Sequence, residues 1–152
     1  MRRIFVVLGV IFLGLIVLGG LAFFIFIQVS KRLDPESKAF VDKIVPVITR
    51  SWNVQDFYPS ISPELAKLAP REKIVPLWAI LAQRLGPLKE YQGSTGEANA
   101  YFNLTTGLSI TAAYRANIVC EKAPAEVQIR TIKHNGVWQI LSIHVNSDAL
   151  LP

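Results

Sequence analysis

Residues 108–120, with the sequence LSITAAYRANIVC, alternate between side chains suited to a protein interior and side chains suited to water. The interior set takes every second position from Leu108 to Cys120. Successive side chains of a strand point to opposite faces of a sheet, so this period of two predicts a long strand with one buried face. A second alternating run covers residues 97–104, and residues 105–107 (TTG) predict the turn between the two.

Two further strands are expected towards the C-terminal end. Residues 127–132 form one of them, and a slip of the period between Ile129 and Ile132 predicts a bulge there. The Asn-Gly pair at residues 135–136 predicts a tight hairpin. The last strand, residues 137–145, is apolar at both parities. Strict alternation places Trp138, Ile140 and His144 on the core side of the sheet, and Leu141, Ile143 and Val145 on the outer side.

Helical signals precede the strands. Apolar residues from Ile74 to Leu85 recur at helical spacing, and residues 86–87 (GP) give the stop. A helix is predicted to begin with Asp34 as N-cap and to kink or end at Pro46, and short helices are capped by Asn53 and Ser62. Helices followed by an antiparallel meander predict an α+β fold, with about three helices packed on a curved sheet of about four strands.

Residues 4–27 contain no charged or polar side chain. As a helix these 24 residues reach roughly 36 Å, against about 30 Å of hydrocarbon in a bilayer. The run lacks the small-residue end of a cleaved signal peptide, so we expect a single-pass anchor in residues 1–30 and a folded domain in residues 31–152.

Basic residues flank the apolar run on both sides, Arg2 and Arg3 before it and Lys31 and Arg32 after it. The positive-inside rule therefore gives little asymmetry. We expect the N-terminus in the cytoplasm and the domain in the bacterial periplasm, because all of the folded mass follows the helix. The net charge of +5 is not gathered into a stripe, so a nucleic-acid partner is not expected.

Several residues resemble the cystatin-like, nuclear-transport-factor-2-like superfamily, and more narrowly its small membrane-anchored bacterial envelope domains. Residues 34–146 carry the resemblance through Trp78, residues 84–86 (RLG), the Tyr114 strand, and residues 136–138 (GVW) with Ile140. It implies a helix-and-sheet roll with a cone-shaped pocket, on which Tyr114, Trp138, Ile140 and His144 are the candidate lining. An anchor followed by such a domain also resembles the inner-membrane scaffold subunit of type IV secretion systems, which is longer. The fold serves isomerases, hydrolases, adaptors and scaffolds alike.

Motifs for catalysis, metal or cofactors are missing from the sequence: no nucleophile elbow, zinc-protease motif, phosphate loop or dinucleotide fingerprint occurs. The single cysteine, Cys120, lies in the apolar set of its strand and excludes a disulfide within the chain. We predict no catalytic, cofactor or metal site, and expect His134 to be solvated at its turn.

Three functions follow. The first is a membrane-anchored interaction module, an accessory or scaffold subunit bound to other membrane-complex subunits or to a second copy through Leu141, Ile143 and Val145. The second is a binder of a small apolar ligand in the cone-shaped pocket. The third is an isomerase-like enzyme, for which His144, Tyr114 and Asp56 are the candidate acid–base groups.

Overall fold

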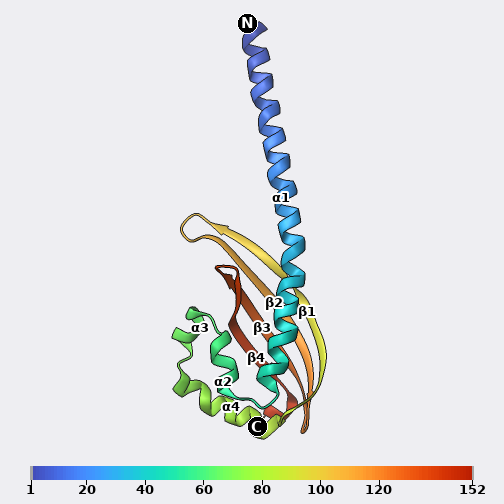
Figure 1. The fold of residues 1–152 in the computed structure, drawn as a ribbon, viewed down its shortest axis with the longest axis vertical. Helices are drawn as coiled ribbons and strands as arrows, with labels where there is room; N and C mark the ends of the chain where they lie inside the picture. Colours follow the sequence, from blue (N-terminus) through green and yellow to red (C-terminus); the bar gives the residue numbers. More distant parts are fainter. Residues whose placement is uncertain (1, 152) are drawn as a thin grey trace.

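The computed structural model describes residues 2–151, except the side chains of residues 2, 29 and 30. The chain has the α+β class expected, with a long N-terminal helix followed by a four-stranded antiparallel sheet in the order β1-β2-β3-β4 (Figure 1). The elements are α1 (Arg2–Thr49), α2 (Val54–Phe57), η1 (Tyr58–Ser60), α3 (Pro63–Leu68), α4 (Arg71–Leu85), β1 (Leu88–Asn103), β2 (Gly107–Cys120), β3 (Pro124–His134), β4 (Val137–Asn146) and η2 (Asp148–Leu150).

α1 is a single helix of 48 residues that joins the apolar run to the folded part of the chain. The predicted helix start at Asp34 is therefore wrong, because Pro35 lies inside α1. A proline removes one N–H donor from a helix and strains the preceding turn, but α1 continues through it. The Asp34 carboxylate does not cap α1 but accepts a hydrogen bond from the backbone N–H of Ala98 on β1, at 2.7 Å. The helix also continues through Pro46 and ends at Thr49.

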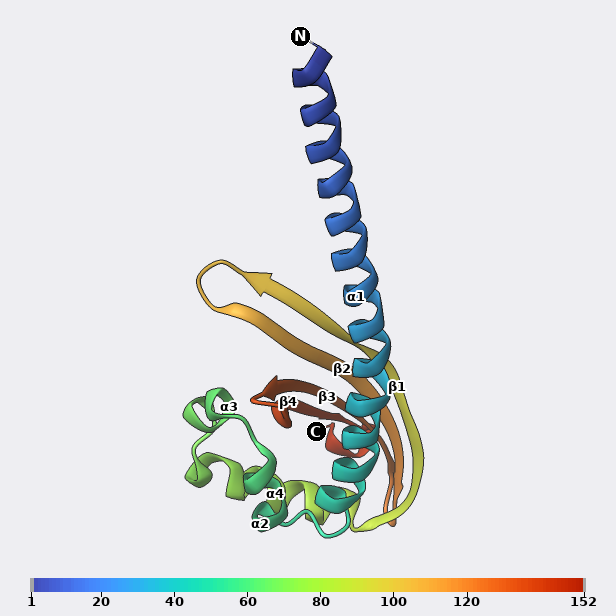
Figure 2. The same ribbon diagram turned by 45° about the horizontal axis from the view of Figure 1, so that its top comes forward.

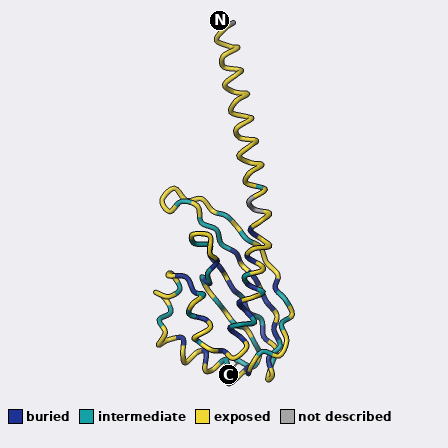
Figure 3. The backbone as a smooth tube through the Cα atoms, in the orientation of Figure 1, coloured by how far each residue is buried: buried dark blue, intermediate teal, exposed yellow. Residues whose placement is uncertain are grey.

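The N-terminal half of α1 makes no part of the domain's core. The described side chains from residue 3 to residue 26 are all exposed (Figure 3). This half of the helix is long and apolar enough to cross a membrane, by length and composition. Leu33 is the first buried residue among those of α1 whose side chains are described, and from there to Thr49 the helix lies along β1 and β2. One helix thus carries both the apolar run and part of the core.

Local signals predicted the starts of α2 and α3 and the end of α4, whereas α4 begins at Arg71, before the first residue of the predicted apolar pattern, Ile74. Asn53 and Ser62 cap α2 and α3 by accepting hydrogen bonds from the backbone N–H groups of Gln55 and Leu65. α4 ends at Gly86, which has a φ of 73° that favours glycine. The Trp78 side chain of α4 packs against two other aromatic residues. Its ring centroid lies 5.4 Å from that of Trp52 and 4.9 Å from that of Phe57.

The sheet is a meander whose inner face carries the core. β2 and β3 pair in unbroken register from Ile110 opposite Lys133 to Val119 opposite Pro124. Tyr114, Ala116, Ile118, Val127 and Ile129 are buried on this face. β1 crosses so close to β2 at Gly96 that an added Cβ would lie 2.0 Å from the Ala113 carbonyl oxygen, so only glycine fits there.

β4 contains the bulge that the sequence pattern had suggested for β3. Arg130 pairs with Ser142 but the next residue, Thr131, pairs with Ile140, so Leu141 is the extra residue. The parity of β4 reverses at Leu141. Ile143 and Val145 therefore share the inner face with Trp138 and Ile140, since Ile143 pairs with the buried Ile129 and Val145 with the buried Val127. The predicted outer-face position of Ile143 and Val145 is wrong, and so is the inner-face position of His144.

Candidate functional site

An apolar groove of about 560 Å³ lies between α4 and β4. We call it the α4–β4 groove. Its floor is formed by Trp78 of α4 and by Ile143 and Val145 of β4, and its rim carries Leu77, Ile80 and Leu81. Trp78 is buried, the two β4 residues are half-buried, and Leu77 and Ile80 remain 59% and 49% exposed. The groove is therefore an open apolar surface, and the domain's own side chains do not fill it.

The sequence of α4 explains why the groove stays open. Its apolar stripe is wider than the part that is buried: Ile74, Trp78 and Leu85 are buried, while Leu77 and Ile80 stay largely exposed. The short α3 and the C-terminal η2 pack beside α4 without closing this space, and Leu65 and Leu150 contribute one side chain each to its walls.

The predicted interaction residues are divided by the bulge. Ile143 and Val145 line the α4–β4 groove, on the helix side of the sheet. Leu141 is half-buried at the bulge itself. The outer face of β4 instead presents Ser142 and His144, both exposed, so it is not the apolar surface that strict alternation predicted.

The predicted cone-shaped pocket is closed. Tyr114, Trp138 and Ile140 are buried, with exposed fractions of 3%, 8% and 0%. The Tyr114 hydroxyl lies 2.8 Å from the Ser37 hydroxyl and donates to the Asp34 carbonyl at 3.1 Å, so α1 occupies the space in front of it. Burial raises the pKa of Tyr114. His144 lies on the opposite face, and these four residues do not converge on one cavity.

The titratable side chains that the sequence singled out are dispersed. His134 pairs with Glu64 at 3.0 Å, Asp56 is exposed on α2, and burial raises the pKa of the Cys120 thiol. Although its side chain belongs to the outer face, His144 also borders the α4–β4 groove, because β4 is the edge strand of the sheet, and it is the one titratable residue among the described residues that line the groove. No cluster of three potential metal ligands occurs within residues 2–151.

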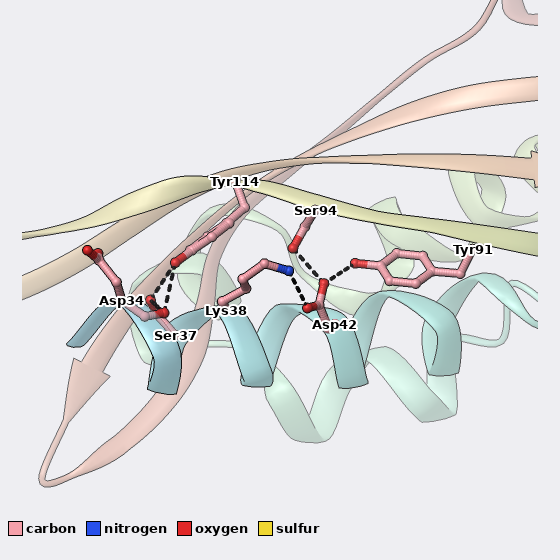
Figure 4. Close-up of polar contacts among 7 residues, drawn as sticks. All are labelled: Asp34, Ser37, Lys38, Asp42, Tyr91, Ser94 and Tyr114. Atoms are coloured by element: carbon pink, nitrogen blue, oxygen red, sulfur yellow. Dashed lines mark hydrogen bonds and ion pairs between the residues drawn. The ribbon is translucent and has the colours of Figure 1, made fainter. Parts of the chain in front are cut away.

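A polar clamp, which sequence reasoning missed, joins α1 to the sheet (Figure 4). The Asp42 carboxylate accepts hydrogen bonds from Lys38, Tyr91 and Ser94, each at 2.6 Å. Burial raises the pKa of Asp42, but these hydrogen bonds outweigh it and the pKa lies below its usual value. Burial and the neighbouring carboxylate raise the pKa of Tyr91. The clamp fixes the position of the sheet relative to α1.

The basic residues beside the apolar run lie on the exposed surface of α1. Arg3 precedes the run, and Lys31 and Arg32 follow it, all three exposed. The side chain of Arg2 lies outside the described part of the chain.

Comparisons of the chain with protein-family models, with curated proteins and with solved structures find no match. The site is therefore interpreted from its own geometry.

Proposed function

We propose that this protein is a membrane-anchored interaction module that binds an extended apolar segment of a partner subunit in the α4–β4 groove. The observation that carries the proposal is the open apolar surface of the groove. Exposed Leu77 and Ile80 stand above half-buried Ile143 and Val145. Contiguous apolar surface of this kind is characteristic of protein–protein interaction sites.

The adjacent sheet edge favours an extended segment as the occupant. β4 is the last strand of the sheet, and its outer edge meets the chain again at Ile140, which bridges to Ile61 and accepts a hydrogen bond from the Ser62 N–H at 2.8 Å. Beyond that contact, β4 continues along the groove to Asn146. A partner strand added there would gain main-chain hydrogen bonds from β4 and insert alternate side chains into the groove.

We place the protein in the bacterial inner membrane, with residues 4–27 across the bilayer and the domain in the periplasm. The length and hydropathy of the N-terminal half of α1 support the anchor. Exposed Arg3 on one side and Lys31 and Arg32 on the other suit the two headgroup layers. In this arrangement the module serves as an accessory or scaffold subunit of an inner-membrane complex, without catalysis of its own.

Kinship with the cystatin-like, nuclear-transport-factor-2-like superfamily is part of the proposal. Its support is the order of the elements, with helices before an antiparallel meander, and the placement of Trp78, Tyr114 and Ile140 in one core. The α4–β4 groove would then be the counterpart of the pocket between the helices and the sheet in that superfamily.

Site-specific photocrosslinking in native membranes tests the proposal. A photoreactive amino acid at Leu77 is expected to give a discrete adduct with one other chain. The same group at Gln83, an exposed residue of the same helix outside the groove, should give none. An adduct of twice the chain's mass would identify a second copy as the occupant. Equal yields from both positions, or none from either, would contradict the proposed function.

A small apolar ligand is the second candidate occupant, favoured by the groove's volume of about 560 Å³, which lies in the range of small-molecule sites. Native mass spectrometry of the purified full chain separates the two candidates. A bound molecule lost on Ile143→Asp, together with no protein adduct from Leu77, would move the ligand ahead of the partner segment.

A further inference from the structure

The hairpin that joins β1 to β2 ends in an apolar tip. Residues 98–114 form a stretch of 17 residues without any charged side chain, between Glu97 and Arg115. Near its turn, four large side chains are exposed: Tyr101 by 58%, Phe102 by 71%, Leu104 by 95% and Leu108 by 61%. We call these four residues the hairpin tip. None of the four belongs to the hydrophobic core. An exposed apolar surface of this kind usually marks a contact with a partner or a membrane.

The tip points towards the end of the molecule that carries the apolar run. In both ribbon views the β1–β2 hairpin rises beside α1, beyond the other two strands, and its turn stands at the height of the middle of α1 (Figures 1 and 2). The burial colouring shows both the turn and the upper half of α1 exposed (Figure 3). The hairpin tip and the end of the apolar run therefore reach the same level.

Hydrogen bonds fix this arrangement at the base of the hairpin. Asp34 accepts from the Ala98 N–H at 2.7 Å, and Tyr114 contacts Ser37 at 2.8 Å. Both contacts hold the hairpin to the first turns of α1 after exposed Lys31 and Arg32. From Ala98 the strand has about 20 Å to reach Leu104, whereas the helix rises only about 10 Å from Asp34 back to Ile27. A hairpin inclined to α1 still brings its turn level with the end of the apolar run.

The chemistry of the tip suits the boundary between headgroups and acyl chains. Phe102 pairs with Leu108 across the two strands and Tyr101 lies on the other face, while Leu104 occupies the turn among Asn103, Thr105 and Thr106. Aromatic and leucine side chains among polar but uncharged side chains are typical of segments that insert shallowly at a membrane interface. A charged tip would resist that transfer, and this one has no charge.

We infer that the β1–β2 hairpin is a second membrane contact, whose tip enters the interfacial region of the bilayer that α1 spans. The inference rests on the proposed anchor in residues 4–27 and not on the α4–β4 groove. Two contacts, one transmembrane and one interfacial, would set the tilt of the domain on the membrane. The α4–β4 groove would then face away from the lipid, at a fixed distance from the membrane surface.

Labelling of the full chain in vesicles of phosphatidylcholine and phosphatidylglycerol tests the inference. An environment-sensitive fluorophore is attached to Leu104→Cys, and in the matched control to Leu68→Cys, another exposed leucine that lies on α3. Native Cys120 is buried, so the unsubstituted chain should take up little label. We expect the Leu104 label to emit at shorter wavelength than the Leu68 label and to lose most of its emission in brominated lipid, whereas the Leu68 label should not.

The outcomes separate the tip from the anchor. If the chain stays with the vesicles after an alkaline wash and the Leu104 label emits as it does in water, the inference is overturned and the anchor stands. If the chain washes off, the anchor fails and the inference with it. A blue shift that vanishes as the protein-to-lipid ratio is lowered would assign the tip to a second copy and would also overturn the inference.

Discussion

At the scale of single residues, Asp42 holds the sheet to α1 through its charged form. Lys38, Tyr91 and Ser94 all donate to it, and its pKa lies below the usual value although burial opposes the shift. Its contribution to stability is therefore present above the unfolded-state pKa of about 3.9 and is lost as the pH falls through the lower pKa of the folded state.

The Asp42→Asn variant should accordingly lose stability at neutral pH. We expect a loss of about 1–2 kcal/mol, a modest value because the side chain is 33% exposed. The gap to the unsubstituted chain should narrow as the pH approaches about 3. Denaturant unfolding of the full chain in detergent between these pH values measures it, with Asp56→Asn on α2 as the control. A gap that is unchanged at acid pH would show that the charge of Asp42 is not what stabilises the clamp.

Residue-scale features were predictable where their causes are local. The caps at Asn53, Ser62 and Gly86 were predicted because each depends on residues within one helical turn. The clamp was not, because Tyr91 and Ser94 lie 49 and 52 positions from Asp42 and meet it only after the sheet has folded. Asp34 shows both effects. Its local sequence predicts a helix cap, but its carboxylate instead accepts a hydrogen bond from a strand residue 64 positions away.

At the scale of elements, the bulge at Leu141 sets which side chains at the end of β4 point to the inner face. The sequence period predicted the four strands and the turns between them, because alternation and the Asn-Gly turn are strong local signals, but it missed the first half of β1, which begins at Leu88 and not at residue 97. It could not locate the extra residue, since a bulge is defined by pairing with a neighbouring strand and not by the bulged strand alone. As a result, Ile143 and Val145, which strict alternation assigned to the outer face, lie on the inner face with Trp138 and Ile140.

Deletion of Leu141 should therefore remove the bulge without turning any inner residue outward. Ser142 then follows Ile140 directly, so Ile143 and Val145 keep their pairing with Ile129 and Val127, and we expect only a small loss of stability. Deletion of Gln128 is the contrast, because β3 has no extra residue there; it turns one end of the strand over, at a cost of about 3–5 kcal/mol. Thermal unfolding monitored by circular dichroism compares the two variants, and equal melting temperatures would contradict the pairing described for β4.

At the scale of the whole molecule, α1 joins an exposed apolar segment to a packed domain. The described side chains of residues 3–26 are exposed, and the buried core begins at Leu33 and Ser37. The apolar half of α1 therefore adds hydropathy but almost no packing to the domain. The half of α1 from Lys31 onward supplies one layer of the core.

A chain that begins at Lys31 should fold as a soluble domain with a melting temperature within a few degrees of the full chain in detergent. It keeps Leu33, Ser37 and the Asp42 clamp, and Asp34 followed by Pro35 supplies a suitable helix start once the preceding turns are gone. A chain that begins at Ala39 loses Leu33 and the Ser37 contact with Tyr114, so it should unfold at a clearly lower temperature. Carbonate washing of cell membranes provides the second measurement, and should release the chain that begins at Lys31 but not the full chain. If the chain from Lys31 is unfolded while its sequence is intact, residues before Lys31 must support the core, contrary to the exposure of the described side chains of residues 3–26.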